Sequence, residues 1–400
     1  MEIMRPATAG TLESSDAQVT VEPGEGRLEL DLSSSVMNQY GRQIKATVLD
    51  TLERLGVTDA RVTVVDKGAL DCTLKARVEC AVFRSVGAEY SLGRCCAMIP
   101  RPRPERFRLR RTMMFMNAQK PGLIKDAYIY GCDSIMLDLE DAVAENQKDA
   151  ARFSLYHALK SVDYGDTEVI VRINGLDTPH WQEDIRVCVA GGADGIRIAK
   201  CESAQDVKAV EAAVTAAEEE FGVERGRTLL MAALESPKGI LNAYEICAAS
   251  ERMFGVAISG GDLRKCLQTS PTRDGVDMLA ARGQVILAAR AAGIQCFDTV
   301  FTDLDDQEGF EAEVLQNKAM GFDGKSLINP KQIRFVHQVF APTEKEVRQA
   351  EKILRAYREQ SAAGVGVFTV DGKMIDIAFI PGAERTLKLA RACGMYDGEV

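Results

Sequence analysis

At 400 residues, the chain is long enough for two or three domains, or for one large barrel with an added module. Hydrophobic residues make up 46% of it, which supplies a sizeable core, and the net charge of −10 argues against a dedicated nucleic-acid binder. The sequence has no run of about 18 apolar residues, so we expect no membrane span. Its first residues lack the apolar core of a signal peptide, which predicts a cytoplasmic protein.

The N-terminal part, residues 1–88, predicts a small α+β domain. Two segments, AQVTVEP (17–23) and RLELDLSS (27–34), alternate apolar and polar residues as half-buried strands do. The Pro-Gly-Glu-Gly sequence between them predicts that they form a hairpin. We expect a helix, a strand and a second helix to follow, at residues 36–56, 60–68 and 69–85. Residues 89–109 are rich in proline and arginine and predict an extended linker.

Residues 110–340 alternate apolar segments of strand length with longer helical patterns. Eight strand–helix units over about 230 residues match the count and length of a TIM (β/α)8 barrel. The predicted strands lie in segments 112–117, 134–140, 168–174, 195–201, 228–235, 254–260, 296–303 and 321–330. A doubly wound sheet is the main alternative, but it normally has a glycine-rich phosphate turn after its first strand, and MNAQKPG is not one. Residues 341–400 predict a C-terminal extension, a helix, a hairpin turning at Asp371-Gly372 and a final helix.

Two acidic residues, Glu235 and Asp262, stand at the ends of successive predicted strands with one helix between them. In a parallel barrel such residues lie side by side at the mouth, where catalytic groups are found. Neighbouring carboxylates repel each other unless a cation or a shared proton lies between them, and Mg²⁺ prefers such oxygen ligands. The pattern therefore favours a Mg²⁺ site about as strongly as its alternative, in which both acids cap helices.

Arg172 lies within VIVRIN, an otherwise apolar segment. A buried guanidinium needs an anionic or carbonyl partner, so we expect Arg172 to contact either the substrate or an acid at the end of the preceding strand. Those acids are Asp138, Glu140 and Asp141. Lys148, taken alone, is expected to be a solvated helix residue. A metal, an arginine and several acids suit carbon–carbon bond cleavage through an enolate, although a barrel that handles phosphate would fit nearly as well.

Four motifs carry a family resemblance: DLEDAV, VRIN, ALESP and GFDGKSLINP, in that order. Through them, residues 108–395 resemble the β subunit of citrate lyase, the citryl-CoA lyase component. The N-terminal segments PATAGTLESSDAQVTV and DKGALDCTLKARVE resemble the γ subunit, the acyl carrier protein of the same complex. The resemblance therefore implies a natural fusion of γ and β subunits, in which a carrier domain precedes a TIM-barrel lyase domain.

The resemblance also implies which residues bind the prosthetic group, the Mg²⁺ ion and the substrate. Ser14 matches the serine that carries a phosphoribosyl-dephospho-CoA prosthetic group through a phosphodiester. Glu235 and Asp262 match the Mg²⁺ ligands. Arg172 matches the arginine that binds the substrate, which Glu235 also contacts.

The implied reaction is a retro-Claisen cleavage of a citryl thioester to oxaloacetate and an acetyl thioester. Asn117 and Lys148 fall where related lyases contact the ligand. The base that removes the hydroxyl proton is expected to be Asp298, Asp303 or a group from a neighbouring subunit. The resemblance further implies a homo-oligomer, an α subunit that acts as acyl transferase, a transferase that attaches the prosthetic group, and an acetylating ligase.

Two positions depart from the family pattern and leave the substrate open. Ser259-Gly260-Gly261-Asp262 stands where the family usually has Gly-Ala-Glu-Asp, and the first strand ends in Met116-Asn117 instead of Val-Pro. The missing acid removes one negative charge near the metal. The alternatives are therefore a lyase for a related thioester, such as citramalyl- or malyl-CoA, and a carrier scaffold whose barrel has lost catalysis.

Overall fold

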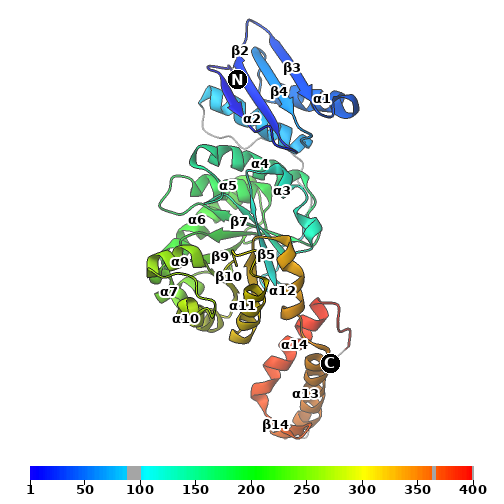
Figure 1. The fold of residues 1–400 in the computed structure, drawn as a ribbon, viewed down its shortest axis with the longest axis vertical. Coiled ribbons are helices and arrows are strands. Elements are labelled where there is room, and N and C mark those ends of the chain that lie inside the picture. Colours follow the sequence, from blue (N-terminus) through cyan, green and yellow to red (C-terminus); the bar gives the residue numbers. More distant parts are fainter. Residues whose placement is uncertain (88–100, 363–365, 399–400) are drawn as a thin grey trace.

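Three units follow one another along the long axis of the molecule: an α+β unit, a barrel and a helical unit (Figure 1). The computed structural model describes residues 1–87, 101–362 and 366–398. Residues 88–100, which include most of the predicted linker, lie outside the described residues. Each unit is built from a continuous stretch of the chain, in the order of the sequence.

The N-terminal unit is a four-stranded sheet, ordered β1-β2-β4-β3 in the described chain, with two helices packed on one of its faces. Its strands are β1 (Ala7–Ala9), β2 (Ala17–Pro23), β3 (Leu28–Ser34) and β4 (Ala60–Asp66). Its helices are α1 (Met37–Arg54) and α2 (Asp71–Val86). The two predicted helices and the three predicted strands are confirmed, and β1 is an additional edge strand.

The predicted hairpin between β2 and β3 is wrong. Strand β4 lies between them and pairs antiparallel with β2 and parallel with β3. The burial of the strands explains this order: Ala60, Val62 and Val64 of β4 are fully buried, whereas the residues of β3 are all partly or fully exposed. The most apolar strand takes the centre of the sheet, and this tertiary preference overrides the local turn signal.

The second unit is a closed ring of eight parallel strands, counted within the described residues. In order around the ring they are β5 (Thr112–Asn117), β6 (Ser134–Asp138), β7 (Glu168–Ile173), β8 (Gly195–Ile198), β9 (Leu229–Leu234), β10 (Met253–Ile258), β11 (Gln295–Asp298) and β12 (Gly324–Leu327). The longer helices outside the ring are α4 (Lys148–Ser161), α5 (Trp181–Gly191), α6 (Ala204–Phe221), α10 (Val276–Ala292), α11 (Gln307–Met320) and α12 (Ile333–Phe340). Because β12 pairs with β5, the sheet has no edge. The predicted TIM barrel is confirmed, and the doubly wound alternative is wrong.

Side-chain alternation along the strands decides what faces the inside of the barrel. The inner core is apolar and contains Met113, Met136, Ile170, Leu229, Met231, Phe254, Ala257 and Phe297. Asp138 and Arg172 lie two positions beyond Met136 and Ile170 on their strands, so they also face inward. They stand at the C-terminal ends of the strands, where a TIM barrel places its active site.

The N-terminal end of the barrel is covered by residues 101–110, which are the described end of the predicted linker and the residue that follows it. Arg110 pairs with Glu168 at 2.7 Å, and Arg101 pairs with Asp194 at 2.7 Å. Both acids stand at the start of barrel strands. This segment therefore closes the end of the barrel opposite the mouth.

The C-terminal unit has its own small core and extends away from the barrel (Figure 1). It contains α13 (Glu344–Ala362), β13 (Phe368–Val370), β14 (Lys373–Ile375) and α14 (Ile380–Ala392). The predicted hairpin turn is confirmed, because Asp371 and Gly372 both have positive φ, 50° and 77°.

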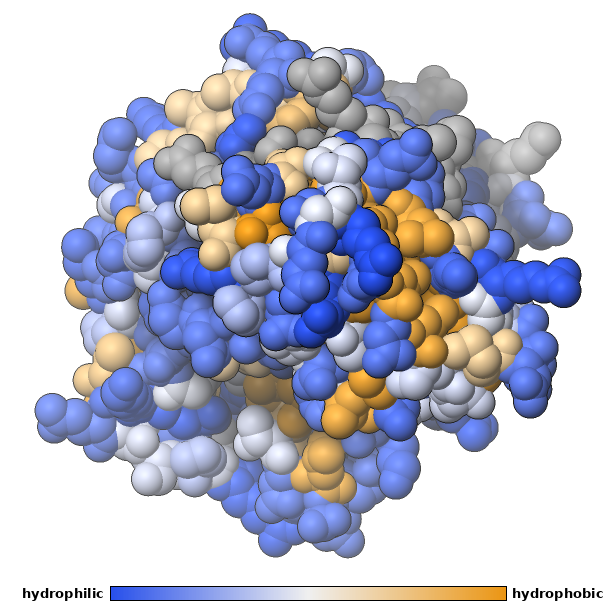
Figure 2. Space-filling model, turned by 90° about the horizontal axis from the view of Figure 1, so that it is seen from above, coloured by the Kyte–Doolittle hydropathy of each residue, from blue (hydrophilic) through white to orange (hydrophobic). Residues whose placement is uncertain are grey.

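Hydrophilic residues cover most of the surface seen from the N-terminal end, and hydrophobic residues appear there in separate patches (Figure 2). None of the helices in the described parts of the chain combines the length and the apolar character needed to cross a bilayer.

Candidate functional site

Glu235 and Asp262 lie in the same pocket at the mouth of the barrel. Glu235 directly follows β9, and Asp262 is in the first turn of α9 (Gly260–Leu267), which follows β10. Strands β9 and β10 are paired in register up to Leu234 and Ile258, so the two acids leave neighbouring strand ends. Both line a pocket of about 450 Å³. The predicted placement of the two acids side by side is therefore confirmed.

The Glu235 carboxylate is buried and has no hydrogen-bond partner in the part of the chain that the structure describes. The residue is 3% exposed, and within the described residues neither of its oxygens accepts a hydrogen bond. Burial, and then the nearby Glu140, raise the pKa of Glu235 to about 7, while Arg197 and Arg172 partly oppose this shift. Ser236 caps the following helix, so helix capping does not explain Glu235. A buried carboxylate with two free oxygens is costly unless a cation or a proton joins it, which fits a site for a hard cation.

Arg172 faces the inside of the barrel and pairs with the acids at the end of β6. Its guanidinium donates two hydrogen bonds to Asp138, at 2.8 and 2.7 Å, and pairs with Glu140 at 2.9 Å. Lys200 approaches the other oxygen of Glu140 at 2.8 Å. The predicted internal salt bridge is therefore present. Glu140 thus joins Arg172 to Lys200, and Lys200 lines the pocket.

A second buried arginine, Arg197, was missed by the sequence analysis. It lies on β8, is 1% exposed, and donates a hydrogen bond to the Ser259 hydroxyl at 2.7 Å. Its Nε and one terminal nitrogen have no partner in the described chain. The ring of Phe115 lies within 5.2 Å of both guanidinium groups, from Arg172 and Arg197. The signal was available, because GIRIAK places an arginine among apolar strand residues just as VIVRIN does.

Together these side chains form a site with two complementary parts. Glu235 and Asp262, which line the pocket, offer carboxylate oxygens for a cation. Buried Arg197 offers N–H groups that have no partner among the described residues, and these suit an anion. A substrate whose oxygens chelate a cation while another part of it gains negative charge would use both parts.

Comparisons with known proteins identify the family to which this site belongs. A family model described as HpcH/HpaI aldolase/citrate lyase matches residues 111–330, which is more than half of the chain. The chain belongs to the HpcH/HpaI aldolase/citrate lyase family. A second model, an acyl carrier family described as malonate decarboxylase delta subunit, matches residues 4–85.

Relatives of this citrate lyase family member match it over nearly their whole length. The citrate lyase subunit beta of Leuconostoc mesenteroides subsp. cremoris is 49% identical over 292 residues, which are 73% of this chain and 97% of that protein. The citrate lyase subunit beta of Escherichia coli K12 is 43% identical over 290 residues, 72% of this chain and 96% of that protein.

A solved structure, CitE from Mycobacterium tuberculosis in complex with magnesium, acetoacetate and coenzyme A, matches with a TM-score of 0.56. Its sequence identity is 30%, and the match covers 71% of this chain and 98% of that one. These findings confirm the resemblance. This citrate lyase family member is a carbon–carbon lyase of the β-subunit type, with a carrier-like domain at its N-terminus.

In this family member, Lys148 and Asn117 bind the backbone of the loops at the mouth. The expectation that Lys148 is solvated is wrong: the residue is 7% exposed, and its ammonium donates to the carbonyls of Leu139 and Glu140 at 2.8 and 2.7 Å. Asn117 accepts a hydrogen bond from the Gln119 N–H and donates one to a loop carbonyl. Both side chains therefore shape the loops after β6 and β5, and their predicted contact with a ligand stays a prediction.

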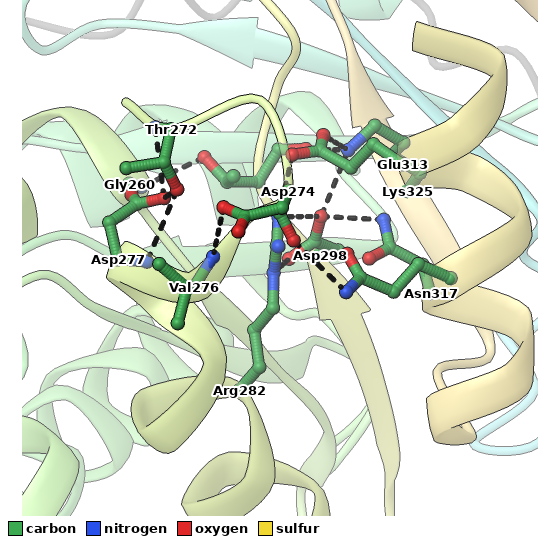
Figure 3. Close-up of polar contacts among 12 residues, drawn as sticks. Gly260, Thr272, Asp274, Val276, Asp277, Arg282, Asp298, Glu313, Asn317 and Lys325 are labelled. Carbon is green, nitrogen blue, oxygen red and sulfur yellow. Dashed lines mark hydrogen bonds and ion pairs between the residues drawn. The ribbon is translucent and has the colours of Figure 1, made fainter. Parts of the chain in front are cut away.

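Asp298 is held in a buried charged cluster outside the ring. Arg282, Asn317 and Lys325 all converge on its carboxylate (Figure 3), with distances of 2.9, 2.6 and 2.9 Å. Burial opposes its charge, but Lys325 and Arg282 hold the pKa of Asp298 well below its ordinary value. Because Phe297 faces the inner core, alternation turns Asp298 outward, towards α10 and α11. The structure therefore argues against the predicted role of Asp298 as the catalytic base.

Ser14 lies at the surface, in a turn between β1 and β2. The neighbouring Ser15 has a φ of 65°, and Asp16 is buried beneath the turn. The turn rests against α3 (Pro121–Ile124), the short helix that follows β5, since a Cβ atom added at Gly122 would lie 3.6 Å from the Ser14 carbonyl oxygen. The predicted attachment point is thus exposed and adjacent to a loop of the barrel mouth.

Proposed function

We propose that this chain is a fusion of the γ and β subunits of citrate lyase. It would cleave a citryl thioester, carried on a phosphoribosyl-dephospho-CoA arm at Ser14, into oxaloacetate and an acetyl thioester. The observation that carries this proposal is the buried Glu235 carboxylate, which shares a pocket with Asp262 and has no hydrogen-bond partner among the described residues. The exposed turn of the carrier-like domain supports the proposed role of Ser14.

Glu235 and Asp262 are the residues that would hold Mg²⁺. Two carboxylates from neighbouring strand ends suit a cation that takes its remaining ligands from water and substrate oxygens. The bound ion supplies Lewis acidity towards the hydroxyl and carboxylate oxygens of the citryl group. The relative from Mycobacterium tuberculosis was crystallised with magnesium, which supports the same ion here.

In the proposed cleavage, residues of the chain stabilise the negative charge that develops and accept the proton that is released. The hydroxyl proton leaves, a carbonyl forms on the oxaloacetate fragment, and the electrons of the broken C–C bond pass to the acetyl thioester as an enolate. In this proposal Arg172 and Arg197 stabilise that negative charge, which their shared position near the Phe115 ring supports. Asp303, exposed on the loop after β11, or a group from a neighbouring subunit then remains as the proposed base.

The proposal implies partners for the rest of the cycle. Exchange of acetyl for citryl on the arm requires an acyl transferase, the α subunit. Attachment and acetylation of the arm require a transferase and a ligase. We further propose that the chain forms a homo-oligomer within this complex.

Citryl-CoA cleavage by the purified full chain tests the metal part of the proposal. We expect activity with Mg²⁺, loss of activity with EDTA, and loss in Glu235→Ala. Glu220→Gln, on the outer helix α6 where it pairs with Arg186, is the matched control and should retain activity. Activity that survives both EDTA and Glu235→Ala would contradict the proposed metal site. Faster cleavage of citramalyl-CoA or malyl-CoA than of citryl-CoA would show that one of these thioesters is the substrate.

Intact-mass spectrometry of protein purified from its native host tests the carrier part. We expect a mass increase that matches the prosthetic group, located on Ser14 by peptide mapping and absent in Ser14→Ala. An unmodified chain in a host that makes the arm would contradict the proposed role of this serine.

A further inference from the structure

One guanidinium ties the Ser14 turn to two segments of the barrel. Arg77, on α2, is 1% exposed and donates two hydrogen bonds to Asp16, at 2.8 and 3.1 Å. It also donates to the Ser154 hydroxyl on α4 at 3.0 Å, and to the Gln119 carbonyl on the loop after β5 at 3.0 Å. The carrier-like domain and the barrel thus share a buried charged group.

Asp16, the partner of Arg77, holds the Ser14 turn in shape. Its carboxylate accepts hydrogen bonds from the N–H and the hydroxyl of Thr11, at 3.0 and 2.8 Å, and from the Ala17 N–H at 2.8 Å. By binding Asp16, the Arg77 guanidinium therefore holds the backbone on both sides of Ser14 in place. Because Arg77 binds Asp16 and the barrel at once, the turn keeps one orientation towards the barrel.

The turn is placed at the same end of the barrel as the site. It rests on α3, and Glu13 approaches Lys120 at 3.6 Å in the same loop. That loop follows β5, whose last residue, Asn117, is in register with Asp138 of β6. Asp138 in turn binds Arg172, which Glu140 joins to Lys200 of the pocket lining. The attachment serine therefore stands beside the loop after β5, at the end of the barrel that holds the pocket.

The contact between α2 and α4 extends well beyond Arg77. Ala150 and Phe153 of α4 belong to the hydrophobic core of the N-terminal unit, and the rings of Phe83 and Phe153 lie 5.6 Å apart. Buried Glu79 contacts the His157 ring at 2.7 Å. If the domain moved away, this apolar surface would be exposed, and charged groups on both sides would lose their partners. Breaking a buried pair of this kind is costly, which favours a fixed contact.

From these contacts we propose that the carrier domain is docked permanently on its own barrel. The prosthetic arm, and not the domain, then moves, and it delivers the thioester to the barrel of the same chain. Arg77 acts as a positioning residue for this delivery, through Asp16 and the Ser14 turn. The inference rests on the proposed function, because it requires an arm on Ser14.

Substitutions that disturb the contact from the barrel side test the docking. Ser154→Arg introduces a second cation and extra volume against Arg77 without altering the carrier domain, and Ser161→Arg, exposed at the end of the same helix, is the matched control. In holoenzyme loaded with citryl on the arm, we expect Ser154→Arg to slow single-turnover cleavage about tenfold or more, equivalent to at least 1.4 kcal/mol. Cleavage of free citryl-CoA, which bypasses the carrier, should be unchanged in both variants.

Arg77→Lys and Arg77→Met separate positioning from folding. We expect the lysine variant to recover part of the arm-bound rate that the methionine variant loses, with free citryl-CoA cleavage equal in both. If no variant or wild-type protein cleaves free citryl-CoA, the proposed function itself fails. Equal arm-bound rates in wild type, Ser154→Arg and Arg77→Met, with free citryl-CoA still cleaved, would overturn the docking alone.

Co-expression of two inactive chains tests delivery within one chain. One chain carries Ser14→Ala with an intact barrel, and the other carries a loaded Ser14 with Glu235→Ala. We expect the purified mixed assembly to remain inactive towards arm-bound citryl, although the Ser14→Ala chain still cleaves free citryl-CoA. Recovery of arm-bound turnover in the mixed assembly would show delivery to a neighbouring barrel and overturn the inference.

Discussion

Glu235→Gln should change how the stability of the barrel depends on pH. The wild-type carboxyl group titrates at about 7 in the folded chain, against an ordinary value of 4.5. Between these two pH values the folded chain holds a proton that the unfolded chain releases, so the free energy of unfolding falls as the pH rises. At about 1.4 kcal/mol per pKa unit, the loss approaches about 3 kcal/mol and is complete above pH 7. Glutamine does not titrate, so the variant should not show this loss.

The single tryptophan, Trp181, provides a suitable probe, because it begins α5 on the outside of the barrel. Urea unfolding of wild type and Glu235→Gln would be followed by tryptophan fluorescence in EDTA at pH 5 and pH 8. The quantity to compare is the difference between the two proteins, in which the contributions of all other groups cancel. Glu220→Gln serves as the control, since its carboxylate is largely exposed.

Added Mg²⁺ should restore the free energy of unfolding that is lost when Glu235 ionises. A proton and a cation compete for this carboxylate, so Mg²⁺ should bind more tightly at pH 8 than at pH 6. At ten times its dissociation constant, Mg²⁺ should stabilise wild type by about 1.4 kcal/mol, and Glu235→Gln much less. The free energy of unfolding could instead depend on pH and on Mg²⁺ equally in both proteins. That result would refute the claim that buried Glu235 binds a proton or Mg²⁺ in the folded chain.

Three further substitutions separate structural from catalytic roles. Asp298→Asn should lower the free energy of unfolding by about 3–5 kcal/mol, because it leaves buried cations without their partner; a loss of kcat at unchanged stability would instead make Asp298 catalytic. Arg172→Lys keeps the charge but loses the paired contact with Asp138, so we expect kcat for citryl-CoA cleavage to fall about a hundredfold; an unchanged kcat would limit Arg172 to its salt bridge. Lys148→Met leaves two loop carbonyls without their donor and should cost about 1–3 kcal/mol in urea unfolding; no measurable change would show that solvent replaces the ammonium.

The barrel and half of its site could be predicted from the sequence because their signals are local. Each barrel strand is a short apolar segment that ends in polar residues, and a parallel barrel brings all such ends to one mouth. That rule predicts that Glu235 and Asp262 lie together at the mouth, and the structure has both in one pocket. It also applied to Arg197, whose position in GIRIAK was available and was not used.

The tertiary structure alone decided which polar groups face the pocket and which are already bound. Asp298 stands at a strand end like Glu235, yet it faces outward, and the partners that occupy it come from segments 16 to 27 residues away. Likewise β4 entered between β2 and β3, and Arg77 reached the barrel from another domain. The physical reason is common to all three: the apolar pattern of a segment records how deeply it is buried, whereas the pairing of strands and charges depends on neighbours that are distant in the chain.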